Sequence, residues 1–189
     1  MDNVNAPYFV KLRNRGLIHI EGDDRKAFLQ GLISNDMGKL KPGAILYACL
    51  LTPQGKFLHD FFIHEGDGFL LLDCEGGARA QDLYRRLSMY KLRSNVQLSV
   101  EEENEVYAII SAERPGNGAL PDPRHNHMGY RSFMQPEKIE EAAFDVWDRH
   151  RIRLCVPDGS RDMQLEKSTL LESNIDKLNG LSFKKGCYM

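Results

Sequence analysis

The chain has 189 residues and a formal net charge of −2, and 42% of its residues are hydrophobic and 28% are charged. This composition is that of a globular protein rather than a disordered one, and the length allows one compact domain or two small ones. A general nucleic-acid binder is usually more basic, and apolar runs such as FLLL are far too short to span a membrane.

The first part of the chain alternates strand and helix patterns. GLIHIEG (16–22) predicts a strand, and DDRKAFLQGLISND (23–36) predicts a helix with apolar residues at i, i+4. AILYACLLT (44–52) is too apolar for one face and predicts a strand buried on both faces. The turn Pro53-Gln54-Gly55 then predicts a hairpin with KFLHDFFIH (56–64) as its second arm.

Three further elements complete this part. GFLLLDC (68–74) predicts an apolar strand, and NVQLSV (95–100) alternates as a strand does. Between them, GGARAQDLYRRLSMYKL (76–92) predicts a helix, because its apolar residues recur at i, i+3, i+4 and i+7. Its basic residues most simply form a solvated face, and the alternative is contact with RNA or with an acidic partner surface.

The second part begins after the acidic run EEENE. VYAIIS (106–111) and YRSFM (130–134) predict strands, and residues 113–129 between them are rich in Pro, Gly and Asn and predict a loop. PEKIEEAAFDVWDRHRIRL (136–154) predicts a helix with Ile139, Ala142, Ala143 and Val146 on its buried side. LEKSTLLES (165–173) predicts one or two helical turns.

The order of these elements predicts an α+β fold with two small sheet-plus-helix units. We expect the first unit at residues 1–100 and the second at 101–189, with segments that interleave. The chain has no internal repeat of fixed period.

The cysteines are not spaced for a metal site. No two of them form a C-x-x-C pair, so a structural zinc or a cluster held by this chain alone is not predicted. The polar N-terminal stretch has no signal-peptide pattern, so we expect free thiols in a reducing compartment, the cytoplasm. Cys187 follows Lys184, Lys185 and Gly186, and nearby cations favour the reactive thiolate. The alternative is an ordinary thiol beside two surface lysines.

Several segments, in order, resemble the YgfZ-type folate-binding proteins, which are relatives of the glycine-cleavage T-protein (aminomethyltransferase). The family signature is Lys-Gly-Cys-Tyr-x-Gly-Gln-Glu, and this chain carries its first four residues at 185–188 and ends at Met189. The matching segments are TPQGKFLHDF, YKLRSNV, MGYR, DRHRIRLCVPDGSRD, LLES and FKKGCYM.

The resemblance implies ferredoxin-like α+β units arranged in a ring around a hole that accommodates a folate. The small C-terminal β-barrel of the family would follow the last residue and is absent from this sequence. It also implies binding of tetrahydrofolate or another reduced folate, and a role in iron–sulfur protein maturation or in tRNA modification, with assembly or client proteins as partners. In a eukaryote, the compartment would be the mitochondrial matrix.

The resemblance also suggests site residues. Glu172 matches an acid that recognises the pterin, and a carboxylate can accept the two adjacent N–H groups of a pterin edge. Tyr130 could stack on the pterin and Arg131 could bind the glutamate tail. Asn35 and Asp36 match the Ser-Asn-Asp or Thr-Asn-Asp segment of these relatives. Read alone, these residues are a surface acid, an exposed strand pair and a helix-ending turn.

Cys187, with Lys185 beside it, is the residue to which the resemblance gives thiol or redox chemistry. The T-protein has an acidic pair where this chain has His59 and Asp60. His59 could act as a general base, but it is not a permanent anion, so aminomethyl transfer is in doubt. Three functions remain: a folate-binding accessory factor of iron–sulfur cluster assembly or tRNA modification, a folate-dependent one-carbon transferase, and a non-enzymatic interaction module.

Overall fold

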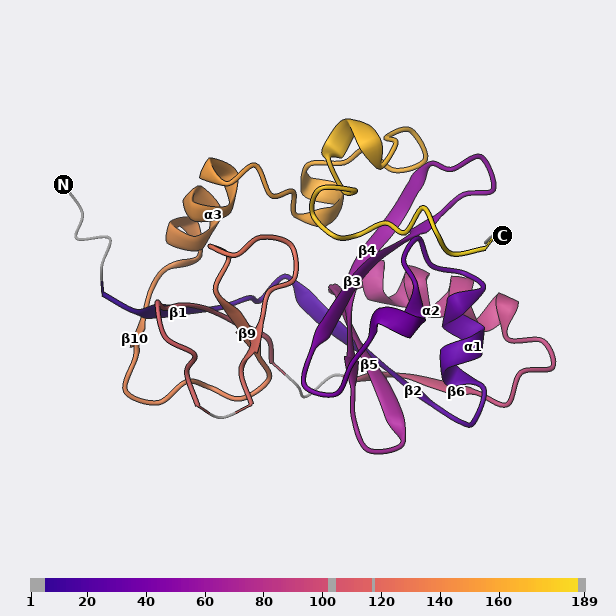
Figure 1. The fold of residues 1–189 in the computed structure, drawn as a ribbon, viewed down its shortest axis with the longest axis horizontal. Coiled ribbons are helices and arrows are strands. Elements are labelled where there is room, and N and C mark those ends of the chain that lie inside the picture. The colour runs from indigo at the N-terminus through magenta and orange to yellow at the C-terminus, as the bar shows by residue number, and fades with distance from the viewer. Residues whose placement is uncertain (1–5, 102–104, 117, 187–189) are drawn as a thin grey trace.

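A computed structural model describes residues 6–101, 105–116 and 118–186 of the chain. Two five-stranded sheets lie next to each other along the long axis of the molecule (Figure 1). The α+β class predicted from the sequence is therefore confirmed. No helix in the described ranges is long and apolar enough to cross a membrane.

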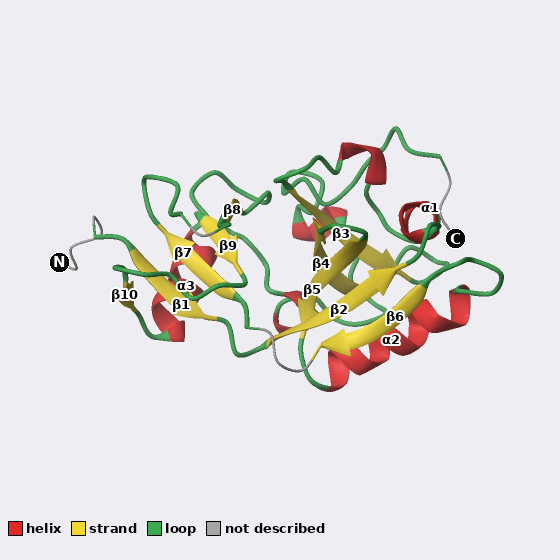
Figure 2. Ribbon diagram, turned by 90° about the horizontal axis from the view of Figure 1, so that it is seen from below, coloured by secondary structure: helices red, strands yellow, loops and turns green. Residues whose placement is uncertain are grey.

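The first sheet is antiparallel throughout. Its strands, in spatial order, are β3 (Ile45–Leu51), β4 (Phe57–Glu65), β5 (Phe69–Glu75), β2 (Arg15–Glu21) and β6 (Gln97–Glu101). Helices α1 (Arg25–Gln30) and α2 (Ala78–Tyr90) pack on one face of it, and α2 runs beside β6 (Figure 2). As predicted, β3 is buried along its whole length.

The second sheet combines one N-terminal strand with strands from residues 107–141. Its strands, in spatial order, are β10 (Glu140–Glu141), β1 (Tyr8–Lys11), β7 (Tyr107–Ile110), β9 (Tyr130–Ser132) and β8 (Leu120–Pro121). Because β1 pairs with β7 and β10, an N-terminal strand lies in the sheet built mainly from later residues. The division at residue 100 stays a prediction.

Two hydrophobic cores share the first sheet. On one face Leu29, Leu83 and Leu87 of the two helices pack against the strands. On the other face a second core joins Tyr47 and Phe62 to strands β1 and β7, to helix α3 (Phe144–Arg153) and to the chain after α3. This second core connects the two sheets.

Two predicted helices are shorter in the structure. The predicted helix 23–36 ends at Gln30, because Ile33 forms a bridge with Leu50 of β3 and the chain joins the sheet instead. The predicted helix 136–154 begins only at Phe144, because β10 pairs with β1 before it. Its buried residues are Trp147 and Arg151, so the predicted apolar stripe that ended at Val146 was wrong.

Short 3₁₀ turns occur in the connecting segments. They are η1 (Met37–Lys39), η2 (Gly159–Arg161) and η3 (Leu171–Ser173), and η3 falls inside the predicted helical stretch 165–173. The segment that contains η2 and η3 contributes Met163, Ile175 and Leu178 to the second core. The C-terminal part of the chain is thereby packed onto the first sheet (Figure 1).

Candidate functional site

The interior between the two sheets contains charged side chains grouped around the ring of Phe62. The guanidinium groups of Arg15, Arg124 and Arg131 lie 5.5, 4.7 and 3.9 Å from the ring centroid. Each of these arginine side chains is only 2% exposed. A cation over an aromatic face is attracted by the ring quadrupole, and more strongly when water is excluded.

Buried carboxylates face these arginines. Asp73 accepts a hydrogen bond from Nε of Arg15 at 2.7 Å and one from Nε of Arg131 at 2.9 Å. Asp122 accepts from Nη2 of Arg124 at 2.8 Å. Burial alone would raise the pKa of Asp73, but Arg131 and Arg15 outweigh burial and hold this pKa below its usual value. Asp73 is therefore ionised at neutral pH.

Asp60 differs from the other carboxyls of this cluster. Its Oδ2 accepts a hydrogen bond from the Tyr47 hydroxyl at 3.0 Å, whereas its Oδ1 has no hydrogen-bond partner among the described residues. Burial raises the pKa of Asp60, and the neighbouring Arg15 offsets this only in part. Asp60 is thus a buried carboxyl that holds a proton more readily than an exposed aspartate does.

His59 does not face this interior. Its Nε2 lies 3.0 Å from a carboxylate oxygen of Asp82 on α2, on the opposite face of the sheet from Asp60. Successive side chains of a strand point to opposite faces, which accounts for the difference between these two neighbours. Burial, together with the positive charge of Arg79, lowers the pKa of His59 to about 4. His59 is neutral at pH 7, and of the two residues only Asp60 faces the interior between the sheets.

The structure does not bring Tyr130 and Arg131 to one site. They are adjacent on β9 and therefore point to opposite faces of the second sheet. Arg131 is 2% exposed and is already bound by Asp73, so its guanidinium is not presented to a folate tail. Tyr130 packs against the small apolar cluster on the other face, which includes Phe9 and Ile109.

Glu172 lies on η3, at the surface of the C-terminal segment. Its Oε1 accepts a hydrogen bond from the backbone N–H of Thr169 at 2.7 Å. This hydrogen bond is the main cause of the lowered pKa of Glu172. The carboxylate is therefore ionised and accessible.

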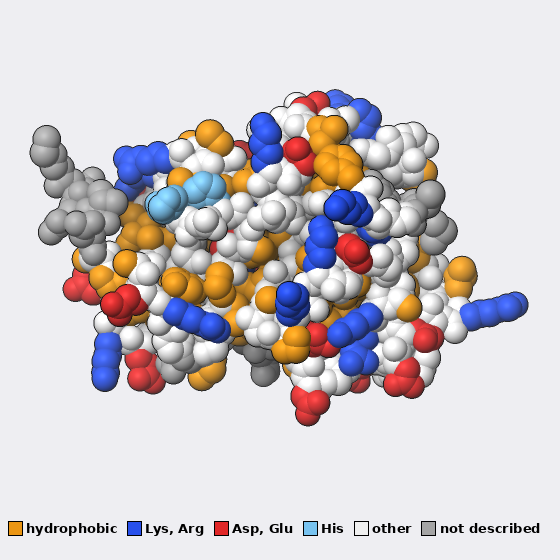
Figure 3. All heavy atoms as spheres, in the orientation of Figure 1, with side chains coloured by type: hydrophobic (Ala, Val, Ile, Leu, Met, Phe, Trp, Pro, Cys, Tyr) orange, Lys and Arg blue, Asp and Glu red, His pale blue; other side chains and the backbone are white. Residues whose placement is uncertain are grey.

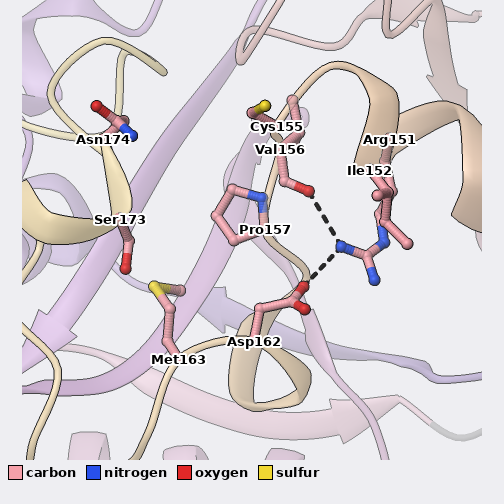
Figure 4. A pocket seen from close by; sticks show the side chains of 9 residues that line it. All are labelled: Arg151, Ile152, Cys155, Val156, Pro157, Asp162, Met163, Ser173 and Asn174. Atoms are coloured by element: carbon pink, nitrogen blue, oxygen red, sulfur yellow. Dashed lines mark hydrogen bonds and ion pairs between the residues drawn. The ribbon is translucent and has the colours of Figure 1, made fainter.

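A pocket of about 270 Å³ opens beside η3, between the end of α3 and the C-terminal segment (Figure 4). One wall is held by Arg151, whose Nη1 donates to the Val156 carbonyl at 3.1 Å and to Asp162 at 2.6 Å. Ser173 and Asn174, which directly follow Glu172, line the other side. The full lining is Arg151, Ile152, Cys155, Val156, Pro157, Asp162, Met163, Ser173 and Asn174.

Asn35 ties the first sheet to the C-terminal segment. Its Nδ2 donates to the backbone carbonyls of Tyr47 at 2.8 Å and Asn179 at 2.7 Å, and the residue is 1% exposed. Asp36 accepts from the backbone N–H of Gly38 at 2.9 Å and so caps η1. These contacts are structural, and they place Asn35 and Asp36 beside the end of the chain.

Lys185 anchors the last described residues to the end of α1. Its Nζ donates to the carbonyl oxygens of Gln30 and Ile33, both at 2.6 Å. Carbonyls at a helix C-terminus lack intrahelical partners and carry partial negative charge, so a lysine is favoured there. Burial lowers the pKa of Lys185, and Asp36 opposes this effect. The structure thus brings Asn35, Asp36 and Lys185 together, apart from Tyr130 and Arg131.

Cys187 lies outside the described residues. The three described cysteines form no disulfide: Cys49 and Cys74 are buried, and Cys155 is exposed. Burial raises the pKa of both Cys49 and Cys74, which keeps these thiols protonated. Among the residues that the structure describes, no group of three His, Cys, Asp or Glu side chains is arranged to hold a metal ion.

The sequence interpretation missed the buried charged cluster. The sequence does carry one kind of local signal for this cluster, which is an acid inside an otherwise apolar strand. It occurs twice, as Asp60 in β4 and as Asp73 in β5. An ionisable residue in such a strand requires a buried partner. The partners of Asp73 are Arg15 on β2 and Arg131 on β9, and the local pattern does not reveal partners so distant in sequence.

Comparison with known proteins gives relatives over nearly the whole chain. The chain is 31% identical to the "Iron-sulfur cluster assembly factor IBA57 homolog, mitochondrial" of Mycosarcoma maydis, and 95% of this chain and 51% of that protein are aligned. It is 32% identical to the human mitochondrial assembly factor IBA57, with 95% and 59% aligned. The chain thus spans little more than half the length of these relatives. No family model matches the sequence.

Among solved structures, the chain is similar to the glycine cleavage system aminomethyltransferase T of Bartonella henselae. The TM-score is 0.51 at 21% sequence identity, and the alignment covers 58% of this chain and 30% of that protein. At this identity the likeness concerns the fold. The T-protein-like fold that the sequence resemblance implied is therefore confirmed for this part of the chain.

Proposed function

We propose that this chain acts as an accessory protein of iron–sulfur cluster assembly. The observation that carries the proposal is its similarity, over 95% of its length, to proteins named as mitochondrial iron–sulfur cluster assembly factors. The chain covers 51% and 59% of these two relatives, so the activity of a whole assembly factor is proposed for it and not carried over from them.

The chemistry of the C-terminal segment supports this proposal. Iron–sulfur clusters are held mainly by cysteine thiolates, and Cys187 follows Lys185, which is fixed to the end of α1. An iron–sulfur cluster takes four protein ligands, and Cys187 would supply one of them. A cluster bound through Cys187 would therefore be shared with a partner protein that supplies the remaining ligands.

Complementation tests this role. The chain would be expressed in the mitochondria of Mycosarcoma maydis cells that lack their own IBA57 homologue, and the activity of a mitochondrial iron–sulfur enzyme would be measured. We expect activity to recover with the parent but not with Cys187→Ser, with equal amounts of the two proteins verified by immunoblotting. Equal recovery with Cys187→Ser would exclude the thiol from the function.

Binding of tetrahydrofolate is a second proposal, and one feature of the structure favours it. The ionised Glu172 lies directly before Ser173 and Asn174, which line the pocket beside η3. At about 270 Å³ this pocket is slightly smaller than a site for a whole drug-sized ligand, so it suits a pterin ring better than an entire folate. Glu172 would accept the pterin N–H groups at the pocket rim.

Anaerobic calorimetric titration of tetrahydrofolate into the parent, Glu172→Gln and the control Glu166→Gln tests this second proposal. Glu166 is an exposed acid on the same segment. We expect Glu172→Gln alone to weaken binding. Equal affinity in all three proteins would place the folate elsewhere, and lack of binding by the folded parent would exclude a folate site in this chain by itself.

Three finer expectations remain part of the proposal. Membership of the YgfZ-type group and a role in tRNA modification rest on the sequence resemblance. The relatives are named as mitochondrial, which supports the mitochondrial matrix as the compartment if the source is a eukaryote.

One-carbon transfer is the weaker alternative function, because the neutral His59 faces α2 rather than the interior between the sheets.

A further inference from the structure

The end of α2 exposes an unusual amount of apolar surface. Met89 is 62% exposed, Tyr90 37% and Leu92 87%, so three large apolar side chains within four residues face solvent. The remaining large apolar side chains known to be exposed, from Met134 to Phe183, are spread over other parts of the chain. Exposed apolar groups that cluster in this way mark interaction surfaces more often than single ones do.

Leu92 is held in a conformation that leucine rarely adopts. Its φ is 39°, in the left-handed region where Gly, Asn and Asp are the usual residues. At this position Asn would fit the backbone better and would remove an exposed apolar side chain. A leucine here stabilises neither the local backbone nor the core, which points to a contact with another molecule.

The surface around these side chains is basic. Three arginines of α2, Arg79, Arg85 and Arg86, hydrogen-bond to acids of the chain itself, so the positive charge here comes chiefly from Lys91 and Arg93, with Arg85 shared with Asp82. Arg85 lies four residues before Met89 on the same side of α2, and Lys91 and Arg93 flank Leu92. In Figure 3, a Lys or Arg side chain projects near a hydrophobic one at the right-hand end of the molecule, with acidic side chains below them.

The same surface is hollowed. A depression of about 690 Å³ is lined by Asp24, Tyr90, Leu92, Arg93 and Ser94. Asp24 accepts a hydrogen bond from the backbone N–H of Asn95 at 2.7 Å, which orders the loop that forms one side of the depression. A concave, partly apolar surface with a basic rim can receive an inserted side chain.

We propose that the end of α2 docks an acidic segment of a partner protein that inserts a large apolar side chain beside Tyr90 and Leu92. The carboxylates of the segment would lie against Arg85, Lys91 and Arg93, so charge complementarity selects an acidic partner. The concave shape favours a protein segment, which can insert a side chain, over the flat anionic surface of a lipid bilayer.

Selection from a phage-displayed library of random dodecapeptides on the folded chain tests this proposal. We expect the selected peptides to combine several Asp or Glu with a Leu, Ile, Phe or Trp. Fluorescence anisotropy would show that Leu92→Asn weakens the best peptide about tenfold or more. Arg93→Glu would also weaken it and reduce its salt dependence. Leu92→Asn suits the backbone at this position, so the loss would not reflect unfolding, and a thermal melt verifies this.

Two matched controls lie outside the surface. Met134→Asn removes another exposed apolar side chain, and Arg149→Glu reverses an exposed charge on α3. Both are expected to bind the peptide as the parent does. The proposal is overturned if selected peptides are not acidic, or if Leu92→Asn binds them unchanged. It is also overturned if vesicles rich in phosphatidylserine are bound through Leu92 while no acidic peptide is selected, since the surface then serves a membrane.

Discussion

His59 and Asp60 are neighbours on β4 and point to opposite faces of the first sheet. His59 lies 3.0 Å from Asp82 of α2, and Asp60 accepts a hydrogen bond from Tyr47 in the interior between the sheets. One is a neutral imidazole within the helix-covered core, and the other is a buried carboxyl with a raised pKa. The two residues are adjacent in the sequence motif, but the pleat of the strand places their side chains on opposite faces of the sheet, so they cannot act on one ligand.

The buried carboxyl of Asp60 makes stability depend on pH. The pKa of Asp60 is higher in the folded chain than in the unfolded chain. Its contribution to the free energy of unfolding is therefore fully present below the unfolded pKa, and it is lost as the pH rises through the folded pKa. Asp60→Asn stays neutral, so we expect this variant to be within about 1 kcal/mol of the parent at pH 7 and less sensitive to rising pH.

Asp60→Ala is the contrasting variant. It leaves the buried Tyr47 hydroxyl without its acceptor, and we expect a loss of about 1–3 kcal/mol. Urea unfolding followed by the fluorescence of Trp147, the single tryptophan, measures both variants between pH 5 and 8. If Asp60→Asn were as damaging as Asp60→Ala, the carboxyl would be ionised in the folded protein.

Two buried histidines should make the fold sensitive to acid. Burial is the main cause that lowers the pKa of both His59 and His64 to about 4. A depressed folded pKa gives stability that is present above the unfolded pKa and is lost as the pH falls from about 6.5 towards 4. Each histidine would contribute up to about 3 kcal/mol to this loss.

His64→Leu tests this acid sensitivity. The imidazole Nε2 of His64 is buried and has no hydrogen-bond partner among the described residues, so leucine should be tolerated at pH 7. We expect a smaller fall in the urea midpoint between pH 7 and 5 than in the parent. The exposed His127→Leu is the control, and an equal change in both variants would contradict the prediction.

Arg131 is expected to matter for folding rather than for folate binding. Arg131→Met removes one of the two arginine partners of the buried Asp73, and breaking a buried ion pair costs about 3–5 kcal/mol. Asp73 keeps Arg15 as its second partner, so adding Asp73→Asn would leave the buried Arg15 guanidinium without its carboxylate and should not recover the loss. Arg149→Met, at an exposed ion pair, should cost about 0.5 kcal/mol or less. Chemical denaturation of the four proteins is the measurement.

Lys185 is expected to hold the C-terminal segment in place. Lys185→Met removes the hydrogen bonds to Gln30 and Ile33, so we expect a loss of about 1 kcal/mol and faster amide hydrogen exchange across residues 178–186. Lys184 is exposed, and Lys184→Met is the matched control. Equal exchange in the two variants would show that Lys185 does not anchor the segment.

Local patterns alone predicted much of the first sheet. The hairpin of β3 and β4, the strand β5 and the amphipathic helix α2 follow from apolar periodicity and from the turn at Pro53-Gln54-Gly55. Such elements are specified by residues close in sequence. The ends of α1 and α3 were misjudged, because a bridge to β3 and a pairing with β1 overrode the helical pattern.

The sequence by itself determined the α+β class and the strands of the first sheet, and it supplied the charged and polar side chains. Only the tertiary structure decided which of them meet. It placed Arg131 against Asp73, fixed Lys185 to the end of α1 and left Glu172 at the surface. The physical reason is that periodicity records the face a residue takes in its own element, whereas partners distant in sequence are set by how the sheets pack.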